Sequence, residues 1–273
     1  MTGEIFQKKN THFLSIASWE RPGLIAGFTT RCGGVSQAPF SSLNVGLHVG
    51  DNPEDVVKNR MIVANSLTTD LSHYVFCEQT HDATIKKVTP ADCGKGAFDY
   101  ATALKATDGV YTNEKDVFLA LGFADCVPIF FFAPNHQLVG LVHAGWRGTV
   151  LKIAPKMVHT WHTEENVPLE DIQVVIGPSV DVADYVVDDV VIQKVEEVLG
   201  KIATSTYEEI TTGQYRLDLK KVNVELLKQA GLSTNSMEVT TYATRDQSLF
   251  FSHRLEKGQT GRMCAIIGWK GGE

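Results

Sequence analysis

The chain has 273 residues, 43% of them hydrophobic and 21% charged, with a formal net charge of −7. This composition is ordinary for a soluble globular protein. No long run of Lys and Arg is present, so nothing indicates a nucleic-acid groove or binding to an anionic membrane surface. No stretch reaches the roughly 20 apolar residues that cross a bilayer, and the N-terminus lacks the pattern of a secretory signal.

The cysteines do not form the pattern of a disulfide framework. There are five, an odd number, spread widely along the chain, and this distribution favours a reducing compartment, with the cytoplasm as the expected location. No internal repeat, low-complexity tract or Pro/Ser-rich linker interrupts the sequence, so we expect residues 1–273 to form one domain.

Many short apolar runs alternate with helical patterns along the chain. A long glycine-rich loop follows the first predicted strand, as is typical of functional loops. Strands that often neighbour one another, with several helices between them, favour a mixed α/β or α+β fold in which mixed sheets are flanked by helices. In chain order, the sequence predicts a strand at 23–30, the loop at 30–52, a helix at 53–67, strands at 73–80, 108–112, 117–123, 127–133 and 137–144, a helical pattern at 149–162, a strand at 171–177, helices at 188–199 and 218–230, and strands at 237–244 and 264–269.

Three residues set the predicted limits of the helices. Pro53 stands at a favoured first-turn position, and Gly231 ends the helix at 218–230 as a C-cap. Pro155 falls inside the pattern at 149–162, where it should kink the helix or mark a restart.

His81, Cys126 and His143 each stand at the end of a strand-like apolar run. Imidazole and thiolate are ligands that zinc prefers, and three protein ligands leave a fourth position open for water or substrate. Cys126 and His143 are nearly equidistant from the turn-forming residues 134–136, and this near symmetry would place them opposite each other in a β-hairpin. Pro134 excludes a tight type I′ turn, so the register could slip by a residue. The placement of His81 beside them is inferred.

Other polar residues are candidates for binding substrate or phosphate. Arg31 precedes two glycines in TRCGGVS, a loop that could wrap an anion or a sugar. HAGWRGT combines His143 with a strand-to-helix turn, where free N–H groups and Arg147 would suit phosphate. Asn44 and His48 lie in the long loop, and Arg254 follows an apolar run from which it could reach a pocket.

In this order, the motifs TRCGGVS, NVGLHVGD, EQTHDA, ADCVPIFF, HAGWRGT, IGPSV and FFSHR resemble the bacterial laccase-domain family. Its members were once labelled polyphenol oxidases and are now regarded as purine nucleoside phosphorylases. The motifs span residues 30–262, and His81, Cys126 and His143 match the family's zinc ligands. The resemblance implies zinc-dependent phosphorolysis of adenosine, inosine and methylthioadenosine, with adenosine deaminase activity and a layered α/β fold. We take Cys126, His143 and Arg31 as candidate catalytic residues, and Arg31, Asn44, His48, Arg147 and Arg254 as candidates for binding substrate or phosphate.

Three other functions remain open. Copper could occupy the same ligands and oxidise phenols, but the chain has nine histidines and no His-x-His pair, and a blue-copper site would also need a weak axial ligand that we cannot place. Cys126 beside His143 could form a metal-free thiol hydrolase. A non-catalytic zinc-binding or nucleotide-binding protein is the third alternative. The expected partners are nucleosides and phosphate, with no nucleic acid or membrane.

Overall fold

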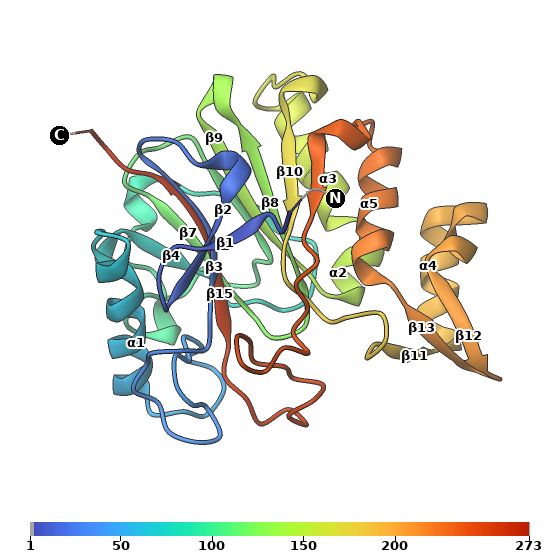
Figure 1. Cartoon of the computed structure of the whole chain (residues 1–273). Helices are drawn as coiled ribbons and strands as arrows, with labels where there is room; N and C mark the ends of the chain where they lie inside the picture. The colour runs from blue at the N-terminus through green and yellow to red at the C-terminus, as the bar shows by residue number, and fades with distance from the viewer. Residues whose placement is uncertain (1–2, 273) are drawn as a thin grey trace.

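Two six-stranded mixed sheets face each other in the computed structural model of the chain, which describes residues 3–272 (Figure 1). The first sheet contains, in spatial order, β1 (Phe6–Lys8), β2 (Phe13–Ile16), β3 (Leu24–Thr29), β15 (Met263–Trp269), β7 (Phe118–Phe123) and β4 (Tyr74–Phe76). The second contains β14 (Met237–Val239), β10 (Gln173–Ile176), β8 (Val127–Ala133), β9 (Leu138–Ala144), β6 (Gly109–Thr112) and β5 (Ile85–Lys87). Both sheets contain parallel and antiparallel pairs.

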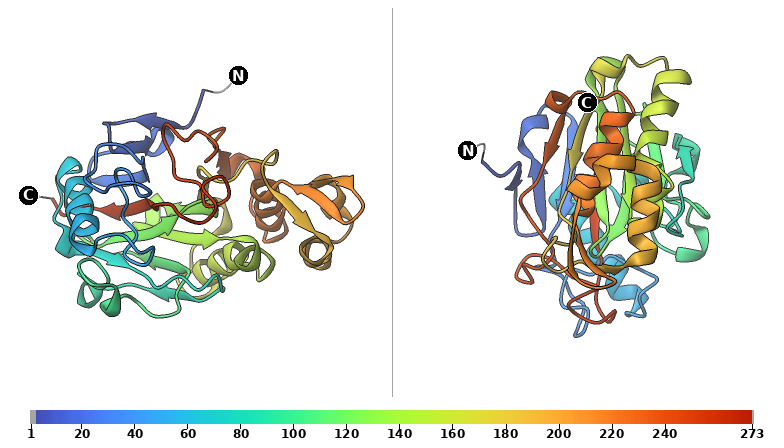
Figure 2. Two further views of the ribbon diagram at one scale, coloured as in Figure 1. Left: turned by 90° about the horizontal axis from the view of Figure 1, so that it is seen from below. Right: turned by 90° about the vertical axis from the view of Figure 1, so that its right-hand side faces the viewer.

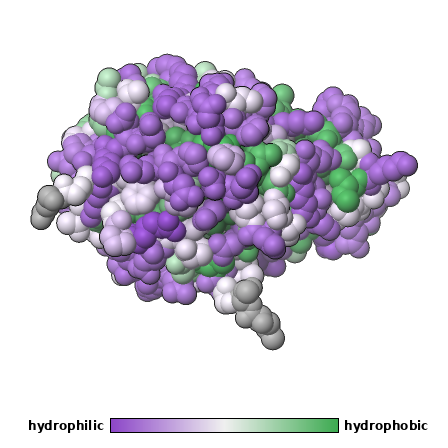
Figure 3. Space-filling model, turned by 90° about the horizontal axis from the view of Figure 1, so that it is seen from above, coloured by the Kyte–Doolittle hydropathy of each residue, from purple (hydrophilic) through white to green (hydrophobic). Residues whose placement is uncertain are grey.

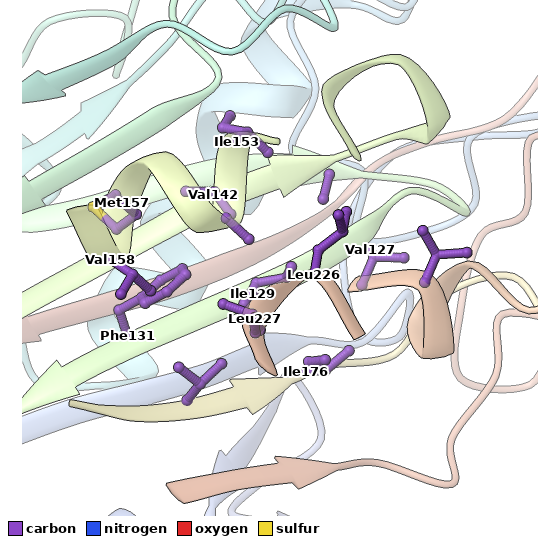
Figure 4. Close-up of a cluster of buried hydrophobic side chains, with 14 of the residues drawn as sticks. Val127, Ile129, Phe131, Val142, Ile153, Met157, Val158, Ile176, Leu226 and Leu227 are labelled. Carbon is purple, nitrogen blue, oxygen red and sulfur yellow. The ribbon is translucent and has the colours of Figure 1, made fainter. Parts of the chain in front are cut away.

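The apolar run in β8 is explained by burial on both faces of the second sheet. Phe130 and Phe132 belong to the core between the two sheets, whereas Ile129 and Phe131 belong to the core under the helices (Figure 4). Because successive side chains of a strand point to opposite faces, a strand covered on both sides needs apolar residues at every position. The second sheet is therefore an interior layer of the molecule.

Helices cover the outer face of each sheet. Val63 of the first helix packs in the outer core of the first sheet, while Met157 and Leu226 from two later helices pack on the second sheet. The helices are α1 (Pro53–Ser66), α2 (Trp146–Val150), α3 (Ile153–Thr163), α4 (Asp189–Leu199) and α5 (Leu219–Gln229). The layers are therefore helix, sheet, sheet and helices, and the predicted layered fold of mixed sheets flanked by helices is confirmed.

The helix limits follow the local signals. α1 begins at Pro53, and the side chain of Asn52 accepts a hydrogen bond from the Glu54 N–H as its N-cap. The pattern at 149–162 restarts rather than kinks: α2 ends at 150, Lys152 takes a left-handed conformation with φ of 61°, and α3 begins at 153. Pro155 thus falls in the first turn of α3, where its missing N–H costs no helical hydrogen bond.

A small third sheet projects from the layered body together with α4 (Figure 2). No strand was predicted in this region, and the strand predicted at 237–244 is longer than the three residues of β14. The sheet is formed, in spatial order, by β11 (Val186–Asp188), β13 (Gln214–Leu217) and β12 (Tyr207–Thr211).

Hydrophilic residues dominate the molecular surface in the view of Figure 3, with smaller hydrophobic areas between them. Within residues 3–272, no helix is both long and apolar enough to cross a membrane.

Candidate metal centre and its pocket

Three donor side chains converge as the sequence predicted. His81 lies in the loop after β4, Cys126 immediately precedes β8, and His143 lies near the end of β9. Their donor atoms all lie within 4.8 Å of one another, and the two imidazole rings meet edge to face with centroids 4.7 Å apart. Small side-chain adjustments would place all three donor atoms ~2.0–2.3 Å from one shared zinc ion, the bond lengths typical of zinc with imidazole nitrogen and thiolate sulfur.

The hairpin that carries two of these residues has a different register from the predicted one. His143 pairs with Pro128, not with Cys126, because the turn contains a 3-10 segment at 134–136 followed by Gln137 in a left-handed conformation. The partner of His143 is thereby shifted by two residues. Since side chains alternate with a period of two, this shift keeps Cys126 on the same side of the hairpin as His143, and the two still meet.

Asp108 organises the loop and the ring orientation at this centre. Its buried carboxylate accepts hydrogen bonds from the backbone N–H groups of Thr80, His81 and Asp82 at 2.9–3.1 Å. The same carboxylate lies 2.8 Å from Nδ1 of His143, which leaves Nε2 of that ring as the nitrogen for a metal. A carboxylate behind a ligating histidine is typical of metal sites, where it fixes the ring and raises its basicity.

The electrostatics of the centre favour a thiolate. Burial raises the pKa of the Cys126 thiol, but the positive charge of His143 and hydrogen bonds with His143 and His81 outweigh burial and lower this pKa below its usual range. Burial lowers the pKa of His143, whereas the Cys126 thiolate and the hydrogen bond with Asp108 raise it, and the net shift is upward. A bound cation would take the place of the imidazole proton beside this sulfur.

The donor set fits a divalent metal ion. Two imidazoles and one thiolate match the three-ligand pattern of catalytic zinc sites, in which the fourth position faces a cavity. Such a cavity is present: a pocket of about 430 Å³ includes all three donors in its wall, and His81 is exposed. The pocket is lined by His48, Gln79, His81, Gly122, Ala124, Asp125, Cys126, His143, Trp146, Val180, Tyr185, His253, Arg254 and Arg262.

Three of the predicted binding residues lie at this pocket or next to it. His48 and Arg254 line the pocket itself. Arg147 lines an adjoining hollow of about 260 Å³ that shares His81 and Cys126 with the main pocket. The guanidinium of Arg147 lies 5.2 Å from the ring of Trp146.

Arg31 and Asn44 lie behind the pocket and are not among its lining residues. The guanidinium of Arg31 forms a 3.1 Å ion pair with Glu256 and stacks over the ring of Phe251 at 4.3 Å. The buried side chain of Asn44 accepts a hydrogen bond from the backbone N–H of Arg262 at 2.9 Å. Both side chains therefore join the long loop to the segment before β15.

Three polar residues at the site were not predicted from the sequence. These are Asp108, Arg262 and Asp125, and the carboxylate of Asp125 accepts hydrogen bonds from the hydroxyls of Thr244 and Ser252. For Asp125 a local signal exists, because it directly precedes a predicted ligand. The other two are placed by contacts between distant segments.

Replacing Gly145 by alanine is expected to weaken metal binding roughly tenfold, near the lower end of the effect of disturbing the groups around a metal site. A Cβ atom at Gly145 would lie 3.0 Å from Sγ of Cys126 and 3.1 Å from Cδ2 of His81, so both ligands would have to move. The backbone φ of −66° suits alanine, so the effect is steric. Competition with a chromophoric chelator measures it. Gly272→Ala, where a Cβ meets nothing within 4 Å, is the control, and equal affinities in the two variants would contradict this geometry.

Fold and site together define a layered α+β protein with a candidate three-ligand metal centre in the wall of an open pocket. The chain belongs to the family described as multi-copper polyphenol oxidoreductase laccase, whose sequence model matches residues 25–270. This assignment agrees with the resemblance found in the sequence motifs.

Individual relatives resemble nearly the whole chain. Purine nucleoside phosphorylase YlmD of Bacillus subtilis strain 168 is 52% identical over 248 residues, which cover 90% of this chain and 89% of that protein. The protein of the same name from Geobacillus stearothermophilus is 47% identical over 266 residues, 97% of each chain. The crystal structure of YlmD from Geobacillus stearothermophilus superposes with a TM-score of 0.96 at 46% identity and covers 98% of this chain and 100% of that chain.

Proposed function

We propose that the chain is a zinc-dependent purine nucleoside phosphorylase that also deaminates adenosine. Its substrates are adenosine, inosine and methylthioadenosine, from which phosphate releases the free base and ribose 1-phosphate or its methylthio analogue. The observation that carries the proposal is the convergence of His81, Cys126 and His143 in the wall of a pocket of about 430 Å³, a volume typical of small-molecule sites. The names of the relatives support the same reaction.

Zinc is the proposed metal because the donors suit it better than copper. A blue-copper site adds a long axial ligand, most often methionine and in some sites glutamine, to its two imidazoles and one thiolate. Gln79 lines the pocket, but its amide oxygen accepts from the Gly122 N–H and its amide nitrogen donates to the Gly122 carbonyl. No methionine lines the pocket within residues 3–272, and the sulfur of Met263 instead accepts a hydrogen bond from the Phe251 N–H at 2.9 Å. When bound, zinc supplies a Lewis acid with an open coordination position.

The residues of the chain bind and orient the reactants. In phosphorolysis an oxygen of phosphate forms a bond to C1′ of the ribose, while the bond from C1′ to the purine nitrogen breaks and its electron pair leaves with the base. Trp146 and Tyr185 offer aromatic faces on which a purine can stack. We retain His48, Arg147 and Arg254 as candidates for direct contacts with the substrates. Arg31 and Asn44 are proposed to position the loops around the pocket.

Product identification tests the function. The zinc-loaded protein is incubated with adenosine, with and without phosphate, and the products are separated by chromatography. We expect adenine and ribose 1-phosphate only when phosphate is present, and inosine under both conditions. Inosine as the only product would contradict phosphorolysis, and the absence of any product at high protein concentration would favour a non-catalytic binding protein.

A thiol hydrolase is the second candidate, because the pKa of Cys126 is lowered beside His143 and a thiolate–imidazole pair can act as a nucleophile and base. Chelation separates the two functions. A thiol enzyme keeps its activity in the presence of a strong chelator and loses it with iodoacetamide, whereas the proposed phosphorylase is expected to lose its activity to the chelator and regain it with added zinc.

A further inference from the structure

Arg262 lies in the wall of the pocket with a guanidinium held by the backbone. Its Nη1 donates hydrogen bonds to the carbonyl oxygens of Thr260 and Gly261, both at 3.0 Å. Its own backbone N–H donates to Asn44, and its carbonyl accepts from the N–H of Val45. The side chain is therefore oriented before any ligand binds, and its Nε and Nη2 groups make no hydrogen bond within residues 3–272.

The charge of Arg262 has no acidic partner. None of the ion pairs in the described part of the chain includes this residue. The acid closest to it in the pocket wall is Asp125, whose carboxylate already accepts hydrogen bonds from two hydroxyls and from the Arg254 N–H. The negative charges of Cys126 and Asp125 favour the half-buried guanidinium, but neither group forms an ion pair with it, and an arginine fork matches the oxygen atoms of phosphate.

Two neutral imidazoles flank this cation. The side chain of His48 is open to the pocket. The surrounding protein nevertheless desolvates its ring, and this desolvation and the charge of Arg262 lower the pKa of His48 to about 4. Burial and Arg262 also lower the pKa of His253. At neutral pH both rings are uncharged, so each offers one N–H donor. The other cation of the main pocket, Arg254, lies with its guanidinium 5.3 Å from the ring of Tyr185.

Arg262 lies in a different part of the wall from the two aromatic residues, on whose rings the other two arginines, Arg147 and Arg254, stack. Trp146 and Tyr185 also line the adjoining hollow, which they share with His81 and Cys126. Arg262 and His48 line only the main pocket. His81 and Cys126 line both cavities, so the candidate metal centre lies near the aromatic residues and near Arg262, an arrangement that suits a purine on one side and an anion on the other.

We propose that Arg262 is the residue that binds the attacking phosphate, with two phosphate oxygens taken by its Nε and Nη2 groups and with His48 and His253 as flanking donors. The inference deepens the proposed phosphorylase function and rests on it. Arg147, the site suggested by the sequence, is exposed and stacks on Trp146, and α2, the helix that contains it, has only five residues. An exposed cation binds phosphate more weakly than an oriented and partly buried one.

Calorimetric titration of the zinc-loaded protein with inorganic phosphate tests the inference without requiring turnover. Arg262→Gln is expected to weaken phosphate binding at least about 30-fold, because one or two charge-assisted hydrogen bonds are lost. The KM for phosphate should rise by a similar factor, while the KM for inosine changes less than about threefold. Arg262→Lys keeps the charge without the fork and should give an intermediate loss. Arg216→Gln, on the projecting sheet, is the matched control and should bind phosphate like the unmodified protein.

Arg147→Gln distinguishes the rival site. If this variant loses phosphate binding while Arg262→Gln keeps it, the inference is wrong, and it is equally wrong if the unmodified protein binds no phosphate. Zinc content and the thermal unfolding midpoint without phosphate verify that each variant is folded, and Arg262→Lys carries the test should Arg262→Gln fail to fold. If phosphate binding depends on Arg262 but no ribose 1-phosphate is formed, the proposed phosphorylase function is wrong, while the assignment of the phosphate site to Arg262 is supported.

Discussion

Replacing Cys126 by alanine is expected to reduce bound zinc from about one ion per chain to less than about a tenth, because the only anionic ligand of the centre is lost. Phosphorolysis of inosine should fall at least about 1,000-fold in kcat/KM, since the Lewis acid contributes several kcal/mol to the reaction. Elemental analysis of the purified variant measures the metal, and steady-state kinetics at saturating phosphate measure the activity.

The matched control for this change is Cys93→Ser. Cys93 is half-buried, its sulfur lies near the carbonyl oxygens of His73 and Asp116, and it does not line the pocket, so zinc content and activity should both stay unchanged. An alanine variant at 126 that keeps zinc and activity would refute the centre. If Cys126→Ala loses activity while the unmodified protein keeps its activity in a strong chelator, the result would instead favour the thiol hydrolase.

Most strands and helices that bury apolar faces could be predicted from the sequence, although the buried strand β2 was not. The run at 127–133 is apolar at every position because both of its faces are covered, and the helix limits at Pro53 and Gly231 follow from backbone preferences that need no tertiary contact. The strands at 207–211 and 214–217 escaped prediction because most of their side chains are exposed or half-buried, and without a buried face there is no apolar alternation to detect.

The residues of the site also divide into those that local sequence patterns reveal and those that they do not. His81, Cys126 and His143 could be found because each stands at the end of an apolar run, and the ligand types restrict the possible chemistry. Asp108 is 35 residues from His143 in the chain, and Arg262 follows the long loop by more than 200 residues. Nothing local distinguishes these two from surface residues, because their roles arise only when distant segments pack together.

Asp108→Asn is expected to weaken zinc binding about 10- to 100-fold, the range found when the carboxylate behind a ligating histidine is removed. The amide keeps the size of the carboxylate. However, three backbone N–H groups and Nδ1 of His143 bind the two oxygens of the carboxylate, and the amide offers only one acceptor oxygen. Removing one partner from a buried charged pair also costs about 3 kcal/mol of unfolding free energy. Competitive chelator titration and urea unfolding measure the two effects.

The pH dependence gives a second signature of the same carboxylate. Burial raises the pKa of Asp108, but its hydrogen bonds with His143 and with the backbone outweigh burial and hold this pKa below the ordinary value of 3.8. Because the folded protein binds this proton less readily than the unfolded chain, the stabilisation is present above pH 3.8 and is lost as the pH falls through the pKa of the folded state. The asparagine variant should therefore lose less stability than the unmodified protein on acidification through this range.

A second His–Asp pair in the chain provides the control. Asp171 lies 2.9 Å from Nε2 of His136, but both side chains are about 30% exposed. Because solvent screens this pair, Asp171→Asn should lower the free energy of unfolding by less than about 1 kcal/mol. Zinc affinity should not change in that variant, since neither residue lines the pocket. Equal losses of stability in the two variants, with zinc affinity intact in both, would show that the carboxylate of Asp108 neither orients His143 nor holds the loop that carries His81.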